Sequence, residues 1–482
     1  MLDEIINERR KKLELLKDAG IDPYPARVER SFEVARALAD FDKLEKSKKS
    51  VSLAGRLRSM RDQGKIAFAD IEDESGKIQI VLKGDTLTNL EFWRSVLDIG
   101  DFILVTGSVF KTKKGEKSVE AAKLQMLSKS LRPLPDKWAG LEDEEIRLRK
   151  RYLDLIATPG LRELFRKKTI FWETIRAAMK KEGFLEAETA VLESVPGGAE
   201  AEPFKTHHNA LDTDFYLRIS LELPLKRLLV GGFDKVFEIG RIFRNEGIDR
   251  EHLQDYTQME FYWAYRDYND VMELTERMYK EVIKNVCGVL TTECGGKKID
   301  WSKKWPKVDY VDAFKKANGM DPSLASRDEL AKKAKELKLD FDKNAGEGRL
   351  IDMIFKKTVR GTLVEPCFLV NPPVAIEPLA KRNPENPKVV ERFQIVACGT
   401  ELGKGFSELN DPLDQRARFE EQEKARAAGD KEAQRMDEDF LEALEYGMPP
   451  AGGFGMSERF FAILMDKPVR ECVFFPLMRP KK

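Results

Sequence analysis

The chain has 482 residues, and its 84 lysines and arginines are balanced by 84 aspartates and glutamates. A zero net charge gives no overall field of the kind that attracts nucleic acid or membranes, so any nucleic-acid site must be local. The length exceeds what one hydrophobic core usually holds and predicts at least two domains.

Cellular context follows from what the chain lacks. No apolar run approaches the length of a membrane-spanning helix, and residues 1–12 are too charged for a secretory signal. The five cysteines show no Cys-x-x-Cys spacing, which argues against a disulfide framework and a structural zinc site. The three histidines are also too few for a histidine-rich metal site. We expect a cytoplasmic protein without a membrane partner.

The first third of the chain changes from helical to strand-like patterning. Residues 1–48 form an N-terminal extension that opens with a charged, helically spaced segment, 2–19. Five short alternating runs separated by glycines in residues 49–135 predict a small closed β-barrel of the OB-fold type. A stretch with two prolines ends this domain, and residues 136–158 are expected to form a linker helix.

Residues 159–482 alternate helices with antiparallel strands, which predicts an α+β domain. An amphipathic helix is expected over 162–183, and one long polar helix over 414–447. The expected strands include 216–219, 236–244 and 256–262. The lysine-rich segment 297–348 reads as an inserted subdomain whose charges are mostly solvated.

The segment 243–262 carries more charge than a buried hairpin normally does. Arg244 and Glu246 lie two apart, so they share one face of an extended chain, and His252 lies in the loop that follows. The second run places four more side chains on one face: Tyr256, Gln258, Glu260 and Tyr262. An arginine, carboxylates and an aromatic ring together can bind a phosphate and an adenine. The alternative is a solvated hairpin with ordinary salt bridges.

Two further segments suggest phosphate chemistry. Residues 452–459 form a glycine-rich turn that leads Arg459 into an apolar helix; this pattern also occurs in turns that are merely tightly packed. In the segment 401–408, Glu401 and Glu408, with Gln394 seven residues before, could hold Mg²⁺ against ATP oxygens; the alternative is a surface strand with exposed acids.

An acidic set completes the candidate site. Glu222, Glu260 and Glu408 would need a cationic partner if they lay in an otherwise apolar pocket. A substrate amine is such a partner.

An ordered series of segments resembles the class II aminoacyl-tRNA synthetases, and most closely the class II lysyl-tRNA synthetases. The series covers nearly the whole chain and includes AGRLRSMRDQGKIAFADIEDESGKIQ, GFLEAETAVL, PGGAEAEPFKT, YLRISLELPLKRLLVGGFDKVFEIGRIFRNEG, IEPLAK and FSELNDPLDQRARFEEQ. The resemblance implies an N-terminal OB-fold that binds the anticodon and a catalytic domain built on an antiparallel sheet flanked by helices. It also implies a homodimer that uses ATP and Mg²⁺ to activate lysine and then transfers lysine to tRNA-Lys.

The resemblance assigns roles by position. Arg244 bridges the amino-acid carboxylate and the ATP α-phosphate, and Arg459 takes the γ-phosphate; both are the implied catalytic residues. The implied ATP-binding set is Arg244, Glu246, His252, Tyr256, Glu401 and Arg459. The implied lysine-binding set is Gly198, Glu222, Arg244, Glu260, Tyr262, Lys404, Phe406 and Glu408. The implied metal ligands are Glu401, Gln394 and Glu408. The implied anticodon-binding set is Arg61, Phe68, Gln79 and Glu116.

The chain departs from the family pattern at four places. Ala190 replaces a proline of the first class motif, and the third motif reads GFGMSER rather than the usual Gly-Ile-Asp-Arg form. Lys404 replaces an asparagine, and Gln394 replaces a glutamate that usually binds metal. Lys404 adds positive charge near a cationic substrate, and Gln394 leaves Glu401 to carry more of the metal binding.

Three alternatives stay open at this stage. The chain could be a synthetase-like enzyme that lysylates a translation factor, although that branch lacks the barrel. It could instead be a non-catalytic tRNA-binding protein, although it keeps Arg244, Glu246 and Arg459. Phe68 could belong to the barrel core rather than to a binding face, because it sits in the alternating run 66–71.

Overall fold

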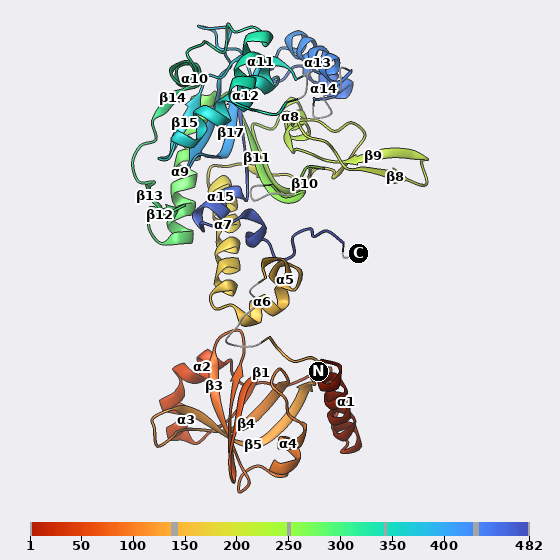
Figure 1. Ribbon diagram of the computed structural model, residues 1–482, viewed down its shortest axis with the longest axis vertical. Helices are drawn as coiled ribbons and strands as arrows, with labels where there is room; N and C mark the ends of the chain where they lie inside the picture. Colours follow the sequence, from red (N-terminus) through yellow and green to blue (C-terminus); the bar gives the residue numbers. More distant parts are fainter. Residues whose placement is uncertain (1, 136–142, 248–251, 342–344, 428–432, 481–482) are drawn as a thin grey trace. The chain divides into compact units, whose positions relative to one another are not determined.

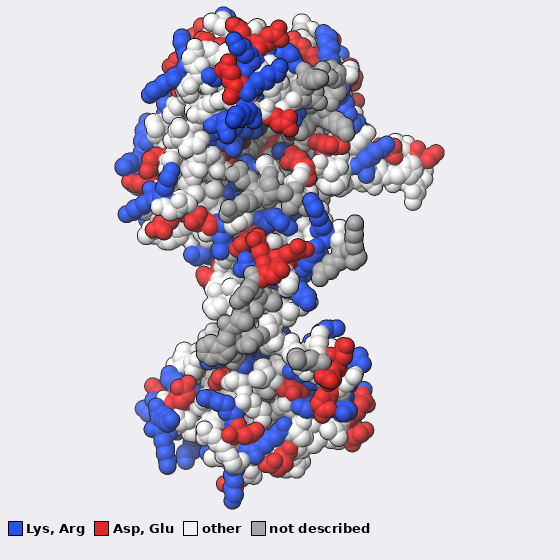
Figure 2. Space-filling view, viewed as in Figure 1, with Lys and Arg blue, Asp and Glu red and all other residues white. Residues whose placement is uncertain are grey.

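The computed structural model describes residues 2–135, 143–247, 252–341, 345–427 and 433–480 (Figure 1). The chain divides into two compact units, Met1–Glu142 and Asp143–Lys482. None of the helices in the described ranges is long and apolar enough to cross a bilayer. On the face drawn in Figure 2, basic and acidic side chains are interspersed over each unit, as the balanced composition predicts.

The first unit is a five-stranded β-barrel. Its strands are β1 (Ser50–Gln63), β2 (Ile66–Glu72), β3 (Lys77–Lys83), β4 (Phe102–Lys111) and β5 (Lys117–Ser128). They close in the order β1-β2-β3-β5-β4, and only β3 and β5 pair in parallel. The helices described in this unit are α1 (Leu2–Asp18), α2 (Val34–Ala39), α3 (Phe41–Ser47) and α4 (Leu90–Val96). This topology confirms the predicted OB-type barrel.

Two features explain how the barrel closes: side chains along its strands alternate between buried and exposed, and β4 and β5 approach closely at one glycine. Along β1 every second side chain from Val51 to Leu57 is buried, so one face of the strand supplies the core. At Gly107 a Cβ atom would lie 1.9 Å from the backbone oxygen of Glu120 on β5. Glycine therefore permits β4 and β5 to approach where their register shifts.

The second unit is built on an eight-stranded sheet with the order β14-β15-β16-β17-β18-β11-β10-β6. These strands are β6 (Leu185–Glu186), β10 (Lys235–Phe243), β11 (Asp255–Ala264), β14 (Lys307–Asp309), β15 (Cys367–Val370), β16 (Arg392–Ala397), β17 (Thr400–Ser407) and β18 (Ala451–Ser457). The central pairs are antiparallel, as predicted, and only the edge strands β6 and β14 join in parallel.

Two smaller sheets and a set of helices complete this unit. The smaller sheets contain β7 (Leu192–Glu193), β8 (Lys205–His208) and β9 (Thr213–Leu217), and β12 (Thr291–Cys294) with β13 (Lys297–Asp300). The helices are α5 (Glu144–Arg149), α6 (Arg151–Ala157), α7 (Leu161–Lys181), α8 (Glu222–Val230), α9 (Tyr268–Cys287), α10 (Tyr310–Asn318), α11 (Arg327–Glu336), α12 (Glu347–Thr358), α13 (Pro412–Ala427), α14 (Glu438–Glu445) and α15 (Arg459–Leu464). Short 3₁₀ turns are η1 (Arg360–Thr362), η2 (Val374–Ile376) and η3 (Val469–Cys472).

The sheet separates two cores because neighbouring strand residues face opposite sides. On β11, Phe261 packs into a core formed with α7, α9 and α15, whereas Tyr262 packs into a core formed with α8 and α14. Glu260 and Gln258 share the side of Tyr262. The charged half of β11 therefore faces the layer that contains α8, and the candidate site lies on that side.

Two predicted helices are shorter in the structure. The described part of the expected linker, 143–158, contains α5 and α6, and Lys150 between them leaves the helical conformation; residues 136–142 lie outside the described residues. The expected helix 414–447 is divided into α13 and α14. Asp437 starts α14 by accepting a hydrogen bond from the backbone of Phe440 at 2.9 Å. Asp437 thus starts a second helix within a polar segment. The composition of that segment alone does not distinguish two helices from one continuous helix.

The predicted insert 297–348 is not a separate body. Its first strand, β13, pairs with β12, and β14 joins the edge of the main sheet. Phe314 and Leu330 from its helices share a hydrophobic cluster with Leu369 of β15. The insert therefore packs against β15 at the edge of the main sheet, through a hydrophobic cluster that the two share.

Candidate active site

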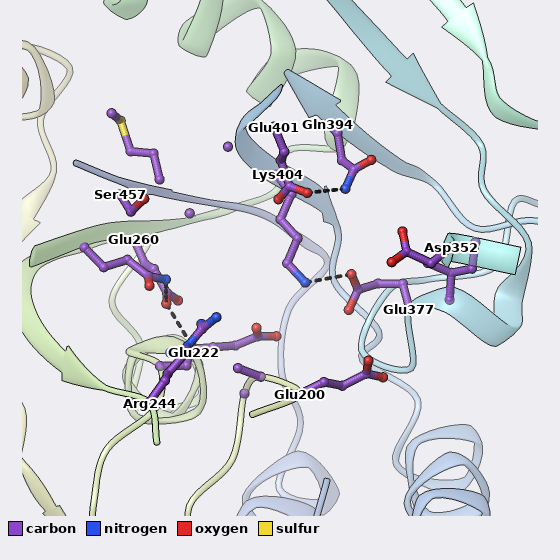
Figure 3. Close-up of a pocket in the computed structure, with 18 of the residues that line it drawn as sticks. Glu200, Glu222, Arg244, Glu260, Asp352, Glu377, Gln394, Glu401, Lys404 and Ser457 are labelled. Carbon is purple, nitrogen blue, oxygen red and sulfur yellow. Dashed lines mark hydrogen bonds and ion pairs between the residues drawn. The ribbon is translucent and has the colours of Figure 1, made fainter. Parts of the chain in front are cut away.

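A cavity of about 730 Å³ opens on the α8 side of the sheet. Most of the residues predicted to bind ATP, lysine or metal line it: Gly198, Glu222, Arg244, Glu246, His252, Tyr256, Glu260, Tyr262, Gln394, Glu401, Lys404, Phe406 and Arg459. Segments far apart in the chain thus meet in one place. In Figure 3 the side chains of Glu200, Glu222, Glu377 and Lys404 point from different elements toward the same space.

Arg244 follows the last residue of β10 and is held on both sides. Its backbone N–H donates to the carbonyl of Gln254 at 2.8 Å, and its Nε donates to the carbonyl of Ile219 at 3.2 Å. Its guanidinium carbon lies 5.7 Å from the centre of the Tyr256 ring. These contacts orient the guanidinium toward the middle of the cavity, where Figure 3 places it.

Glu260 is buried and fully hydrogen-bonded. Its Oε1 accepts from Ser220 Oγ at 2.7 Å, from the Leu221 backbone N–H at 3.0 Å and from Gln258 Nε2 at 2.5 Å. Its Oε2 accepts from the Tyr262 hydroxyl at 2.8 Å. These four donors are all neutral, so they stabilise the carboxylate without cancelling its charge. The negative charge is available to a cation in the cavity.

Tyr262 remains a hydrogen-bond donor at any physiological pH. Burial and the nearby carboxylates Glu222 and Glu260 raise its pKa well above the usual value. The hydroxyl therefore keeps its proton and fixes the orientation of Glu260.

Gly198 shapes the wall next to Glu222. Its φ of +81° lies in the left-handed region, and a Cβ atom there would lie 2.9 Å from the Glu222 Cβ and 3.0 Å from the Ser220 Cβ. Only glycine fits both the conformation and the space. The backbone can then approach a ligand closely at this point.

Behind this wall, Lys226 joins two carboxylates. Its Nζ lies 2.5 Å from Glu222 Oε1 and also contacts Glu408 Oε2, and the three side chains are almost completely buried. Burial alone would lower the pKa of Lys226, but Glu222 and Glu408 outweigh burial and raise it. Burial raises the pKa of Glu222 to about 7 against the opposing charge of Lys226, and burial also raises that of Glu408.

Glu408 therefore differs from its predicted place. It does not line the cavity, and its carboxylate contacts Lys226 instead. Glu401 and Glu408 also stand at opposite ends of β17, and seven residues of strand span about 23 Å. One metal ion cannot bind both.

The opposite end of the cavity is rich in cations. Arg459, the first residue of α15, has a buried Nε without a hydrogen-bond partner among the described residues, so it is poised to donate to an anion. Gln394 Nε2 donates to Glu401 Oε2 at 2.6 Å, and Lys404 Nζ donates to Glu377 Oε2 at 2.8 Å (Figure 3). This end suits a polyanion.

The predicted metal site is not assembled. In the ranges that the structure describes, no group of three or more His, Cys, Asp or Glu side chains is arranged to hold a metal ion. Burial would raise the pKa of Glu401, but Arg392, Arg459 and Lys404 together lower it. Cations already surround the one carboxylate that remains, so this donor set does not fit a protein-bound Mg²⁺.

Two parts of the chain match family models. Residues 143–479 match the tRNA synthetases class II (D, K and N), and residues 51–127 match the OB-fold nucleic acid binding domain. The chain belongs to the class II tRNA synthetases. The antiparallel sheet and its cavity both lie in the part of the chain that matches this family.

Individual members of this family are similar over the full length. The lysine–tRNA ligase of Moorella thermoacetica is 46% identical over 485 aligned residues, which cover 100% of this chain and 99% of that relative. The lysine–tRNA ligase of Bacillus subtilis is 45% identical over 490 residues, covering 100% and 98%. A third, from Roseiflexus sp., is 46% identical over 486 residues, covering 100% and 99%.

The residues proposed for the anticodon lie on the barrel of this synthetase. Arg61 on β1 is directly opposite Phe68 on β2, and Gln79 on β3 accepts a hydrogen bond from Ser118 Oγ at 2.9 Å. Phe68 is half-exposed, while its neighbours Ala67 and Ala69 are buried in the core. The alternative that Phe68 belongs to the core is wrong. Glu116 is exposed in the turn before β5.

Sequence reasoning missed three charged residues of the site. Lys226 follows Glu222 by four residues, and this helical spacing was a usable signal of the ion pair. Glu377 and Arg392 form a salt bridge with Nε and Oε2 3.3 Å apart. Their spacing in the chain carries no such signal, because the contact depends on where η2 meets β16.

Proposed function

We propose that the protein is a lysine–tRNA ligase, which joins lysine to ATP as lysyl-adenylate and then transfers lysine to the 3′-terminal ribose of tRNA-Lys. One observation carries the proposal beyond the family: the buried carboxylates Glu222 and Glu260 and the cations Arg244 and Arg459 line the same cavity. A lysine side chain suits the carboxylates, and the phosphates of ATP suit the cations.

Recognition of lysine is proposed to centre on Glu260. Its hydrogen-bond donors are neutral, so a bound ammonium supplies the opposite charge that none of these donors carries. Tyr262 holds the carboxylate in place, and Phe406 lines the wall beside the aliphatic stem. Glu222 and the backbone at Gly198 are assigned to the α-amino group. A neutral or acidic amino acid would leave a buried carboxylate unpaired, which costs several kcal/mol.

ATP is proposed to lie with its adenine against Tyr256 and its phosphates toward Arg459. Glu246 accepts from the adenine amino group, and His252 and Glu401 border the phosphates. Magnesium enters with ATP, on the phosphate oxygens, as part of the substrate.

The reaction needs no nucleophilic side chain. The lysine carboxylate attacks the α-phosphorus, the bond to the β-phosphate oxygen breaks, and pyrophosphate leaves. Arg244 donates to both the carboxylate and the α-phosphate, so it aligns the reactants and stabilises the charge on the phosphate oxygens. A ribose hydroxyl of tRNA then attacks the lysyl carbonyl, and AMP leaves. Lys404 is assigned to the carboxylate side of the substrate.

The tRNA contact is proposed to use the outer face of the barrel. Phe68 presents a half-exposed ring for base stacking, and Arg61 and Gln79 present polar groups beside it. Glu116 borders this face from the next turn. This face of the barrel would recognise bases by stacking and hydrogen bonding, which does not require a strongly basic surface.

We also propose a homodimer that acts in the cytoplasm, where tRNA charging supplies translation. The segment resembling the first class motif exposes three apolar side chains, with Leu185 47%, Val191 39% and Leu192 47% accessible. Leu185 lies on β6, an edge strand of the main sheet. Exposed apolar residues on a sheet edge support a subunit contact there.

The test is ATP–pyrophosphate exchange with each standard amino acid in turn, followed by aminoacylation of purified tRNA-Lys. Exchange with lysine alone supports the proposal. Exchange with a different amino acid overturns the lysine assignment, and tRNA binding without any exchange supports the non-catalytic alternative.

A further inference from the structure

Four side chains from β16, β17 and the residue after η2 form two pairs at the cationic end of the cavity. Gln394 and Lys404 stand directly opposite each other in the register of β16 and β17. Each reaches a different carboxylate, since Gln394 bonds Glu401 and Lys404 bonds Glu377. The carboxylates of Glu401 and Glu377 are therefore hydrogen-bonded by two residues that face each other across β16 and β17.

Two cations, Lys404 and Arg392, contact the single carboxylate of Glu377. Glu377 contacts both Lys404 and Arg392, and these cations lower its pKa although burial alone would raise it. The ammonium of Lys404 is thus shared with a carboxylate that already has a second cation. Positive charge remains for a ligand in the cavity.

Lys404 reaches that ligand space. Although its ammonium is paired, 38% of its side chain stays accessible, and it lines the cavity. Figure 3 shows the side chain extending from β17 into the open space between Glu377 and Glu222. Glu377, by contrast, is only 5% accessible.

We propose that Lys404 supplies, as a fixed ammonium, the positive charge that a second divalent ion bound by the protein would supply, so that the protein uses only the magnesium carried by ATP. The inference rests on the proposed function. Gln394 contributes to the same effect. Its neutral amide stands next to Glu401, so Glu401 is the one carboxylate of this pair, whereas a divalent ion needs several oxygen ligands. A further divalent ion would also meet the like charges of Lys404, Arg392 and Arg459.

The first test measures Mn²⁺ binding to the full chain without nucleotide, by the loss of the free-ion signal in electron paramagnetic resonance. The wild-type protein is expected to bind no ion at this site. The double variant Gln394→Glu/Lys404→Asn restores a second carboxylate and removes the cation, and it is expected to bind about one ion per chain. Lys404→Asn alone is the matched control and is expected to gain no site, since Glu401 still has the neutral Gln394 beside it and Glu377 keeps its salt bridge with Arg392.

Two results overturn the proposal. One is stoichiometric Mn²⁺ binding by the wild-type protein that is abolished by Glu401→Gln. The other is a double variant that folds, as judged by circular dichroism and its unfolding midpoint, but binds no more Mn²⁺ than the wild type. The first of these results does not depend on the double variant, so the proposal is tested even if the double variant does not fold.

The second test varies free Mg²⁺ at a constant concentration of MgATP during lysine-dependent pyrophosphate exchange. The wild-type rate is expected to change by less than about twofold once ATP is saturated with Mg²⁺, whereas the double variant requires additional free Mg²⁺. A wild-type rate that rises steeply with free Mg²⁺ contradicts the proposal. Failure of the proposed function looks different, because lysine would then support no exchange while Mn²⁺ binding stays as expected.

Discussion

The ammonium of Lys226 and the carboxylate of Glu408 form an ion pair in which both side chains are 0% accessible. Glu222 contacts the same ammonium, so one cation serves two carboxylates from α8 and the end of β17. Removing water from three charges is costly, and only their mutual attraction offsets that cost. Lys226 therefore stabilises the second unit and also holds Glu222 in position in the cavity wall.

Lys226→Met is expected to destabilise the protein by about 3–5 kcal/mol, because it leaves two buried carboxylates without their cation. Urea unfolding of the full chain measures the loss. Lys303→Met is the matched control: Lys303 lies 3.5 Å from Asp300 but is 76% accessible, so its loss is expected to cost under about 1 kcal/mol. Equal effects of the two variants would show that the buried pair adds no stability.

Gly198→Ala is expected to raise the KM for lysine by about tenfold or more, because the new methyl group displaces Glu222. Gly288→Ala separates this effect from backbone strain. Gly288 follows the C-terminal end of α9 with nearly the same φ, +79°, but no atom lies within 4 Å of the place that a methyl group would take there. Both variants are expected to lose about 1–2 kcal/mol of stability, and only Gly198→Ala is expected to change lysine binding. A normal KM in Gly198→Ala would contradict the assigned contact.

Local patterns predicted the parts of the molecule that depend on period and turn chemistry. Two-residue alternation along 256–262 placed Tyr256, Glu260 and Tyr262 on one face, and the structure has them on one wall of the cavity. Alternating runs separated by glycines likewise predicted the barrel, which the strand order confirms.

Contacts that depend on tertiary position were not predictable. Glu401 and Glu408 were predicted at the two ends of one strand and assigned to one metal site, but a strand of this length, about 23 Å, keeps them too far apart to share an ion. The pairing of Lys404 with Glu377 depends on a turn that no periodic pattern marks. The break at Lys150 also escaped prediction, because charged residues on both sides favour helix equally.

Glu260→Gln is expected to lower kcat/KM for lysine in pyrophosphate exchange by about two to three orders of magnitude, since losing one partner of a buried charge pair costs about 2–5 kcal/mol. The KM for ATP is expected to change little, because Glu260 lies at the acidic end of the cavity. Glu273→Gln, on the exposed side of α9, is the control with the same chemical change and is expected to be neutral. An unchanged KM for lysine would remove Glu260 from the substrate site.

The pH dependence of lysine binding is expected to follow Glu222, whose pKa burial raises to about 7. As pH rises through that value the carboxyl loses its proton, and only the ionised form attracts an amine, so kcat/KM for lysine should rise from about pH 6 to about pH 8. Glu222→Gln should flatten this part of the profile. Stability should change in the opposite direction: the folded state holds a proton that the unfolded chain releases, so unfolding becomes easier as pH increases from about 4.5 to about 7.

Phe68→Ala is expected to weaken tRNA-Lys binding by about tenfold to a hundredfold, because one base stacked on an aromatic ring contributes about 1–3 kcal/mol. The half-exposed ring lies on the barrel and outside its core, so the variant is expected to fold normally.

The barrel also offers a control for this variant. Phe102 is 37% accessible at the start of β4, where the Arg56 guanidinium lies 4.2 Å from the centre of its ring. Phe102→Ala removes a ring of the same size from a different strand and is expected to leave the KM for tRNA unchanged. Lysine-dependent pyrophosphate exchange does not involve tRNA, so it should be normal in both variants. An equal loss of tRNA affinity in the two variants would mean that the barrel binds RNA through general contacts, and the assignment of Phe68 to an anticodon base would fail.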